Sequence, residues 1–170
     1  MLRELSPRML EQYGYAAAIE ELARKIRQSG VVDVELDASR LPERMPNDIE
    51  TGLYRITQEL MNNSLKHAEC KKITIRAHQD EEFIHFDYFD DGKGFDYAKA
   101  KQGLGIGNIE SRVAVLRGQI IWTPRIGEGN AVFIQIPTTV KRAELSLLDV
   151  KEVIDALRKW VESFKKKQKS

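Results

Sequence analysis

The sequence has few features that would cross-link the chain or attach it to another structure. It contains a single cysteine, Cys70, so an internal disulfide is excluded and a structural thiol in a reducing compartment is expected. No run of about 18 apolar residues occurs, so the sequence predicts no membrane-spanning helix. The formal net charge is only +1, which gives no indication of a nucleic-acid partner.

Two common phosphate-binding motifs are also missing. The sequence has no GxxxxGK segment followed by Ser or Thr, so a P-loop is not indicated. Its densest glycine cluster, Gly103 to Gly107, lacks the GxGxxG spacing because Asn108 stands where the last glycine would fall. A Rossmann site is therefore not indicated either.

The hydrophobic pattern predicts an α/β domain. With 170 residues, of which 42% are hydrophobic, the chain can form one domain with a sizeable core. Amphipathic patterns predict helices at residues 15–29, 47–68 and 107–117. Alternating patterns predict strands at residues 31–37, 71–79, 82–89, 118–123 and 130–136. A mixed sheet covered by helices on one face, a two-layer α/β sandwich, would bury these patterns in one core.

The helix expected at residues 47–68 has one apolar side. Asn47 follows Pro46 and is its candidate N-cap. Apolar residues recur at intervals of three and four positions, as in a helix with one buried stripe. They are Ile49, Leu53, Ile56, Leu60, Met61 and Leu65.

Four polar residues of this helix converge on one rim. Glu59 and Asn63 are four residues apart, so their side chains project from one face, and Lys66 and His67 follow one turn later. Mg²⁺ needs only one or two protein oxygens beside nucleotide phosphates, and the Asn63 amide could supply one. Glu59 is placed to act as a general base, and Lys66 can bring positive charge to phosphates. The alternative is the solvated polar face of an ordinary amphipathic helix.

The strand expected at residues 82–89 leads into an acidic, glycine-rich loop that contains Asp90, Asp91, Gly92 and Gly94. Glycines at that point let the backbone approach a flat ring without an intervening Cβ. A carboxylate there can accept a hydrogen bond from an exocyclic amine such as that of adenine. The alternative is a hairpin turn of the Asp-Gly type.

The cluster from Gly103 to Gly107 precedes the third expected helix. Residues 97–102 before it are few, polar and lysine-bearing, so they are expected to form a mobile flap. Backbone amides at a helix start attract phosphate oxygens. The glycines would let the flap close over a triphosphate.

Three segments together resemble the nucleotide-binding boxes of the GHKL ATPase superfamily: ELMNNSLKHA, FDDGKGFD and GLGIGNIESRV. They are most similar to the catalytic and ATP-binding domain of bacterial two-component sensor histidine kinases, in the subfamily typified by nitrate and lipid-fluidity sensors. The similarity runs from about Leu2 to Pro137. It implies the Bergerat fold, in which nucleotide lies between helices and sheet.

The resemblance also implies roles for individual residues. Asn63 would hold Mg²⁺, Glu59 would act as the base or assist it, and Asp90 would bind the adenine amine. Gly92 and Gly94 would line the base pocket, and Lys66 and His67 would lie near the phosphates. The lid over ATP would consist of Gly103, Leu104, Gly105, Ile106 and Gly107. Relatives usually carry threonine where this chain has Asn130.

A histidine kinase of this kind transfers the γ-phosphoryl of Mg-ATP to a histidine on a preceding helical domain, and a response regulator then accepts it. The histidines in this chain are His67, His78 and His85. His67 belongs to a nucleotide box, whereas His78 and His85 lie on expected strands as exposed or half-buried residues. The resemblance therefore implies a cytoplasmic kinase fragment that cannot complete the reaction alone, from a parent protein that is often anchored in the membrane.

Two other functions fit the same boxes. One is a serine kinase of the anti-sigma-factor type, which needs no histidine substrate. The other is a nucleotide-sensing interaction module without turnover. A panel of phosphate acceptors would separate the three functions.

The expected division of the chain is a connector at residues 1–14, an ATP-binding domain at 15–138, and a C-terminal region at 139–170. Within the last region, residues 144–165 predict an amphipathic helix with an apolar stripe close to heptad spacing. The stripe could pack on the domain itself, mediate self-association, bind another domain, or belong to an appended helix. The closing KKKQKS is expected to be a solvated charged end.

Overall fold

The computed structural model describes residues 7–101, 103, 105–138, 154–155, 157–159 and 161–162. Its helical elements are α1 (Pro7–Gln28), α2 (Asn47–Asn63), the π-helical turn η2 (Ser64–Ala68), α3 (Tyr97–Ala100) and α4 (Ile106–Val115). Its strands are β1 (Asp33–Arg40), β2 (Lys72–Gln79), β3 (Phe83–Asp90), β4 (Gln119–Trp122) and β5 (Asn130–Pro137). All the helices and strands expected up to Pro137 are present. Their ends are shifted by a few residues, except that α1 begins at Pro7 and not at residue 15.

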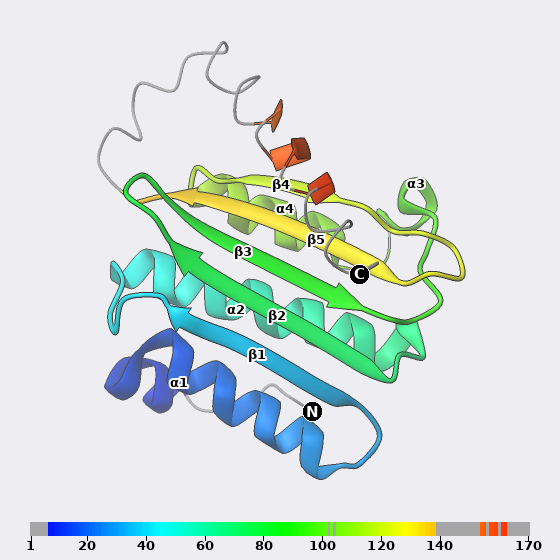
Figure 1. The fold of residues 1–170 in the computed structure, drawn as a ribbon, viewed down its shortest axis with the longest axis horizontal. Coiled ribbons are helices and arrows are strands. Elements are labelled where there is room, and N and C mark those ends of the chain that lie inside the picture. The colour runs from blue at the N-terminus through cyan, green and yellow to red at the C-terminus, as the bar shows by residue number, and fades with distance from the viewer. Residues whose placement is uncertain are drawn as a thin grey trace.

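The strands form one mixed sheet in the order β1-β2-β3-β5-β4. Strands β1 and β2 are parallel because α2 crosses over between them, whereas the β2–β3, β3–β5 and β4–β5 pairs are antiparallel. Figure 1 shows the resulting twisted sheet, with β1 at one edge and β4 at the other. The predicted α/β class with a mixed sheet is confirmed.

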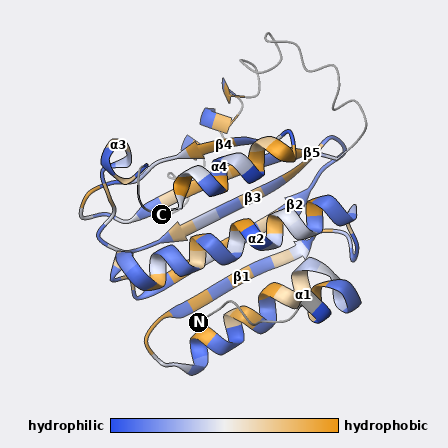
Figure 2. Ribbon diagram, turned by 180° about the vertical axis from the view of Figure 1, so that it is seen from behind, coloured by the Kyte–Doolittle hydropathy of each residue, from blue (hydrophilic) through white to orange (hydrophobic). Residues whose placement is uncertain are grey.

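Helices α1, α2 and α4 lie on one face of the sheet, as Figure 2 shows from behind. Alternate residues of the strands point toward these helices, because successive side chains of a strand face opposite sides. This inner layer is apolar and almost completely buried, and burial of such side chains drives the two layers together. The inner strand residues are Ile73, Ile75, Ala77, Ile84, Phe86, Tyr88, Val132, Ile134 and Ile136.

Helix α2 differs from the expectation at both ends. Asn47 is its first residue, Pro46 occupies the N-cap position, and no side chain caps the helix, so the predicted Asn47 cap is wrong. At the other end the chain winds into η2, a wider turn that redirects the side chains after it. Leu65 is consequently 39% exposed and does not belong to the buried stripe. The other members of the predicted stripe are buried.

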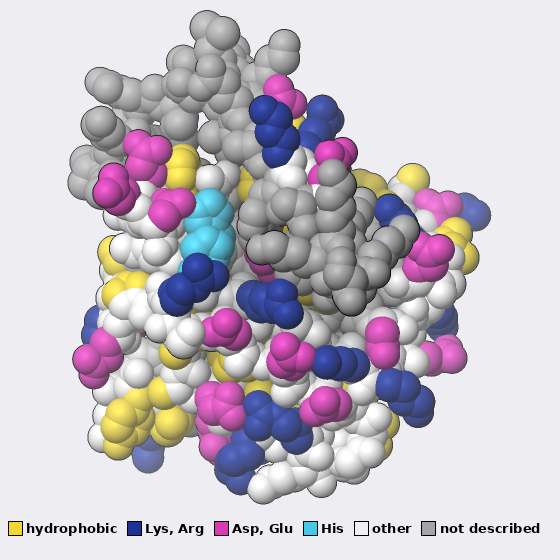
Figure 3. Space-filling view, viewed as in Figure 1, with side chains coloured by type: hydrophobic (Ala, Val, Ile, Leu, Met, Phe, Trp, Pro, Cys, Tyr) yellow, Lys and Arg dark blue, Asp and Glu magenta, His cyan; other side chains and the backbone are white. Residues whose placement is uncertain are grey.

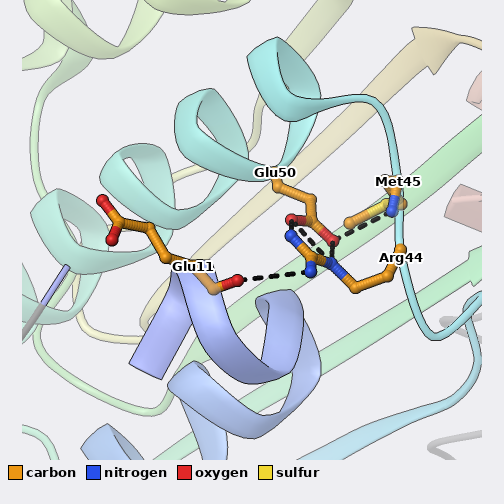
Figure 4. A network of polar contacts seen from close by, with 4 residues as sticks. All are labelled: Glu11, Arg44, Met45 and Glu50. Carbon is orange, nitrogen blue, oxygen red and sulfur yellow. Dashed lines mark hydrogen bonds and ion pairs between the residues drawn. The ribbon is translucent and has the colours of Figure 1, made fainter. Parts of the chain in front are cut away.

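Helix α1 begins at Pro7 and bends at Gly14, whose φ of 79° lies in the left-handed region that favours glycine. A polar network holds the bend against α2 (Figure 4). Arg44 donates to the backbone oxygen of Glu11 at 3.2 Å and forms an ion pair of 2.9 Å with the buried carboxylate of Glu50. The described part of the predicted connector is therefore a helical arm fixed to the domain.

The predicted C-terminal helix is described only in part. Residues 154–155, 157–159 and 161–162 are helical, and the rest of 144–165 lies outside the described residues, as do residues 1–6. Among the described residues, no helix combines the length and the apolar composition needed to cross a bilayer.

Candidate functional site

A cavity of about 330 Å³ lies on the helical side of the sheet, between the end of α2, the end of β3 and the start of α4. This volume lies in the range of pockets that bind small molecules. Residues far apart in the sequence form its wall. They are Leu60, Asn63, Ser64, Lys66, His67, Ala68, Asp90, Lys93, Gly94, Phe95, Ile106, Trp122 and Asn130.

Asp90 is the buried carboxylate of this cavity. Its Oδ2 accepts a hydrogen bond from the Ser64 hydroxyl at 2.8 Å, and its Oδ1 accepts one from the Gly92 amide at 3.0 Å. The Tyr88 hydroxyl in turn lies 2.7 Å from the Ser64 oxygen, to which it donates. Each carboxylate oxygen keeps a further lone pair, so Asp90 is held in one orientation and can still accept from a ligand.

Burial has opposite consequences for the two states of Asp90. Loss of solvation raises the pKa of its carboxyl, and the hydrogen bond from Ser64 partly offsets this rise. The same burial raises the pKa of the Tyr88 hydroxyl well above its usual value, so Tyr88 stays a neutral donor. A ligand amine that donates to Asp90 would favour the ionised carboxylate.

The neighbouring Asp91 points away from the cavity. Its Oδ1 accepts hydrogen bonds of 2.8 Å from the backbone amides of both Lys71 and Lys72, which ties the loop to the start of β2. The chain then continues from this loop into α3, and β3 pairs with β2 and β5. The alternative of an Asp-Gly hairpin turn is therefore wrong.

Glycines at this site allow backbone segments to meet closely. A Cβ at Gly92 would collide with the Ala68 carbonyl oxygen, and one at Gly94 would collide with the carbonyl oxygen of Arg125. Gly129 likewise lies against the backbone of Asp90. Gly94 is on the cavity wall, whereas Gly92 lies behind Asp90 and positions it. The turn around Gly129 therefore supports the acidic loop by backbone contact.

The polar residues of the long central helix separate into two groups. Asn63, Lys66 and His67 line the cavity, with Asn63 half-buried and the other two exposed at its rim. Glu59 lies outside the wall, one turn earlier, where its carboxylate is directly beside Gly105. Glu59 therefore lies at the junction with the start of α4.

The predicted flap contains the short helix α3 and is fixed to α4. The Tyr97 hydroxyl donates to the Glu110 carboxylate, which also pairs with Lys101 at 3.5 Å. Ile106 is buried and lines the cavity, while Gly103 and Gly107 face open space. Gly105 is the N-cap of α4 with a φ of 69°, and Leu104 lies outside the described residues.

Several wall residues were not predicted from the sequence. Ser64 directly follows Asn63, so its place in the same segment was a usable signal. Phe95 and Trp122 had no such signal, since they meet only through folding, with ring centroids 6.2 Å apart. Trp122 Nε1 and Asn130 Oδ1 are buried and have no hydrogen-bond partner among the described residues. A donor and an acceptor of the cavity wall are thus left for a ligand or water.

The sequence of the cavity region matches a known protein family. Residues 48–140 match the family described as "Histidine kinase-, DNA gyrase B-, and HSP90-like ATPase". This chain belongs to that family. The match covers α2, the acidic loop, α4 and β5, so every described wall residue of the cavity lies within the ATPase region.

Sensor histidine kinases are among the relatives of this chain. It is 31% identical over 122 residues to sensor histidine kinase MctS of Rhizobium johnstonii, a match that covers 69% of this chain and 26% of that protein. The matched part is therefore about a quarter of the length of that curated relative.

Solved structures show the same fold. A histidine kinase domain from the blue-light activated histidine kinase of Erythrobacter litoralis EL346 superposes with a TM-score of 0.64 at 21% identity, over 76% of this chain and 63% of that chain. The histidine kinase AdeS of Acinetobacter baumannii superposes with a TM-score of 0.53 at 14% identity, over 71% and 61% of the two chains. The α/β fold of this chain is thus that of histidine kinase structures.

The donor set of the cavity suits a metal held mainly by a ligand. Within the described residues, no three His, Cys, Asp or Glu side chains gather as a metal-binding group. Asn63 contributes an amide at the wall, and hard cations such as Mg²⁺ take this kind of oxygen together with phosphate and water oxygens. Asn63 therefore fits a Mg²⁺ ion that arrives with a nucleotide.

Proposed function

We propose that this chain binds Mg-ATP in the cavity beside Asp90 and is the catalytic ATP-binding part of a sensor histidine kinase. The observation that carries the proposal is the position of Asp90. A buried carboxylate, oriented by Ser64 and Gly92, lies in the same cavity as the Asn63 amide and the cationic Lys66. These groups match an exocyclic amine, a metal and phosphates respectively.

The two ends of the cavity have different chemistry. The base would lie at Asp90, against Phe95 and Trp122, where aromatic rings and a buried acceptor suit adenine. The phosphates would lie toward Lys66 and His67, where charge is solvated and the start of α4 is close. When bound, ATP supplies the γ-phosphoryl group. Glu59 would orient the attacking group or receive its proton.

The phosphoryl acceptor would be a histidine on another domain. His78 and His85 lie on strands with their rings stacked at 4.6 Å, and His67 belongs to the cavity rim. The chain spans about a quarter of the sensor kinase MctS, which leaves room in such a protein for an acceptor domain and a sensor. A cytoplasmic response regulator would be the final acceptor.

Two matched variants test the assignment of Asp90 as the partner of the adenine base. Asp90→Asn should weaken ATP binding by about a hundredfold or more, because an NH2 donor replaces one of the two oriented carboxylate oxygens and the side chain can no longer accept from both its own partners and the amine. Asp91→Asn makes the same chemical change on the exposed neighbour, and its Oδ1 still accepts from both amides, so affinity should stay within about threefold. Calorimetry with Mg-ATP measures both. Equal affinities in the two variants would contradict a base site at Asp90.

A second experiment tests the reaction. The chain is incubated with γ-labelled ATP, Mg²⁺ and separate acceptors: a histidine-bearing helical hairpin domain or a serine-bearing protein. Label on the hairpin, with GTP ineffective, is the expected result, since guanine has a carbonyl oxygen at the position where adenine has the amine that would donate to Asp90. Label on serine would indicate a serine kinase, and ATP binding without transfer to either acceptor would indicate a sensing module.

A further inference from the structure

The face of the sheet turned away from α1, α2 and α4 is called the outer face below. Its central side chains come from alternate positions of β2, β3 and β5, and they are Thr74, Asp87, Phe89, Phe133 and Gln135. No helix of the inner layer covers them (Figure 1). Nevertheless Phe133 is only 1% exposed and Asp87 only 3% exposed. The outer face is therefore covered by some other part of the molecule.

The described C-terminal residues are the helical positions 154–155, 157–159 and 161–162, called the C-terminal segment below. Leu157 is 2% exposed and Val161 is 6% exposed, and their spacing of four places them on one side of a helix. The charged residues of the segment are exposed on its other side. They are Asp155, Arg158, Lys159 and Glu162.

The C-terminal segment lies on the outer side of the sheet. Figure 1 shows it in front of β4, and Figure 2 shows it behind β4 from the opposite direction. Both views therefore place it on the side opposite α2 and α4. Fifteen residues, 139–153, separate it from the end of the described domain at Thr138. A linker of this length can span up to about 50 Å, which is enough to reach any part of the outer face.

We propose that the outer face is a docking surface for an amphipathic helix, and that the C-terminal segment of the same chain occupies it through Leu157 and Val161. The apolar part of the surface is built from Phe89 and Phe133, whose ring centroids are 5.5 Å apart in an edge-to-face arrangement. Both rings line a hollow of about 600 Å³ on this face. The described wall residues of this hollow do not include Leu157 or Val161, so the C-terminal segment covers the outer face beside the hollow and leaves the hollow open.

The edge of the docking surface suits the charged side of the same helix. Lys72 and Arg76 pair with Glu35 at 2.7 and 3.8 Å across β1 and β2. Figure 3 shows basic and acidic side chains mixed over this part of the outer face. A helix that buries Leu157 and Val161 keeps its charged residues at the periphery, where water and ions of both signs can solvate them.

The surface also has features of a reversible contact. Asp87 Oδ1 and Gln135 Oε1 are buried and have no hydrogen-bond partner among the described residues. Buried acceptors without donors cost free energy, and departure of the helix would return both to water. The C-terminal segment should therefore dock and release, unlike α2. Its tether keeps its local concentration high, which favours the same chain over a second copy.

Hydrogen exchange on the full chain tests the docking. In the wild type, amides of the C-terminal segment should exchange about tenfold or more slowly than unstructured amides, independently of protein concentration. Leu157→Gln with Val161→Gln should remove this protection. Arg158→Gln with Lys159→Gln places the same residue type on the exposed side of the same helix and should leave protection within about twofold.

A variant on the sheet distinguishes docking from helix formation alone. Phe89 is half-buried, so Phe89→Gln leaves the strands folded while it removes part of the apolar surface. This variant should lower the protection of the amides in the C-terminal segment, although no residue of that segment is substituted. Unchanged protection in Phe89→Gln, or no protection in the wild type, would overturn the proposal. Protection that rises with protein concentration would show that a second copy is the occupant, which also overturns it.

Discussion

Trp122 shows how a single side chain can have a ligand-directed role that its sequence position does not indicate. It lies at the end of β4, and its ring contacts Phe95 of the acidic loop and Tyr97 of the flap, with centroids 6.2 and 6.3 Å away. Its Nε1 is buried at the cavity wall without a partner in the described part of the chain. A buried donor of this kind is costly unless a ligand or water accepts from it.

We therefore expect Trp122→Phe to weaken ATP binding by about fivefold to tenfold, which corresponds to the loss of one hydrogen bond of about 1 kcal/mol. The phenyl ring keeps most of the contact with Phe95, so the fold should not change. Calorimetry measures the affinity. Fluorescence of a Trp160→Phe variant, in which Trp122 is the sole indole, should change when ATP is added; constant emission would contradict a contact with Trp122.

The free thiol was easier to anticipate from the sequence. Cys70 is buried, its Sγ lies 3.9 Å from the Ser64 carbonyl oxygen, and burial raises its pKa to about 11. A thiol with such a pKa is almost entirely protonated near neutral pH and is a poor nucleophile. The predicted structural role of Cys70 is thus confirmed, because one apolar residue beside a strand is a local property of the sequence.

At the scale of elements, the start of α4 contains glycines with different requirements. Gly105 has a left-handed φ of 69°, and a Cβ there would run into the Glu59 carboxylate. Gly107 is inside the helix, and a Cβ there would meet open space. The sequence GLGIG presents them as equivalent, and only the path of the chain distinguishes them.

Gly105→Ala and Gly107→Ala should consequently have opposite effects. The first adds a left-handed alanine, at about 1–2 kcal/mol, and displaces Glu59, so both melting temperature and phosphoryl transfer should fall. The second replaces glycine by a better helix former and should raise stability by up to about 1 kcal/mol. Thermal unfolding and single-turnover transfer measure the two effects. Equal losses in both variants would show that the helix start tolerates no side chain at all.

The contact between α1 and α2 is another property of elements. Glu50 is buried and accepts from the Met45 amide at 2.9 Å, in addition to its ion pair with Arg44 (Figure 4). On the exposed side of α1, Glu20 pairs with Arg27 at 3.0 Å. The two ion pairs have similar lengths but different surroundings.

Glu50→Ala should destabilise the protein by about 1–3 kcal/mol, because it leaves the Met45 amide without an acceptor and frees the bent arm of α1. Glu20→Ala should cost less than about 1 kcal/mol, since an exposed ion pair contributes little. Urea unfolding of both variants gives the comparison. Similar costs for the two would mean that burial of Glu50 does not strengthen its network.

For the whole molecule, the sequence was sufficient to predict a helix or strand where one hydrophobic pattern determines that element. The strand alternation from Phe83 to Phe89 and the stripe of α2 predicted the mixed sheet and its helical layer correctly. The sequence was insufficient to predict the contacts between segments that are distant along the chain. The approach of Gly129 to Asp90 depends on the packing of β5 against β3, and the exposure of Leu65 depends on the turn η2. Neither leaves a periodic signal in the sequence.

Asp87 links the covered outer face to the stability of the entire protein. Burial raises the pKa of its carboxyl to about 8, and Arg76 offsets part of this rise. The unfolded chain has an ordinary aspartate, which is ionised above about pH 4. Between these values the folded state binds one proton more than the unfolded state, so stability falls as pH rises, by up to about 1.4 kcal/mol per pH unit.

Asp87→Asn removes this proton, and the variant should therefore gain stability relative to the wild type as the pH rises from about 5 to about 8. Above that range the difference should become constant, because Asp87 is ionised in both states of the wild type. Urea unfolding of the two proteins at matched pH values measures the difference, and groups that are the same in both proteins cancel. A difference that stayed flat from pH 5 to 8 would mean that Asp87 is solvated in the folded protein.

Asp87 lies on the proposed docking surface, under the C-terminal segment. The fall of stability with rising pH should therefore be smaller in the Leu157→Gln, Val161→Gln variant, where water reaches the carboxyl.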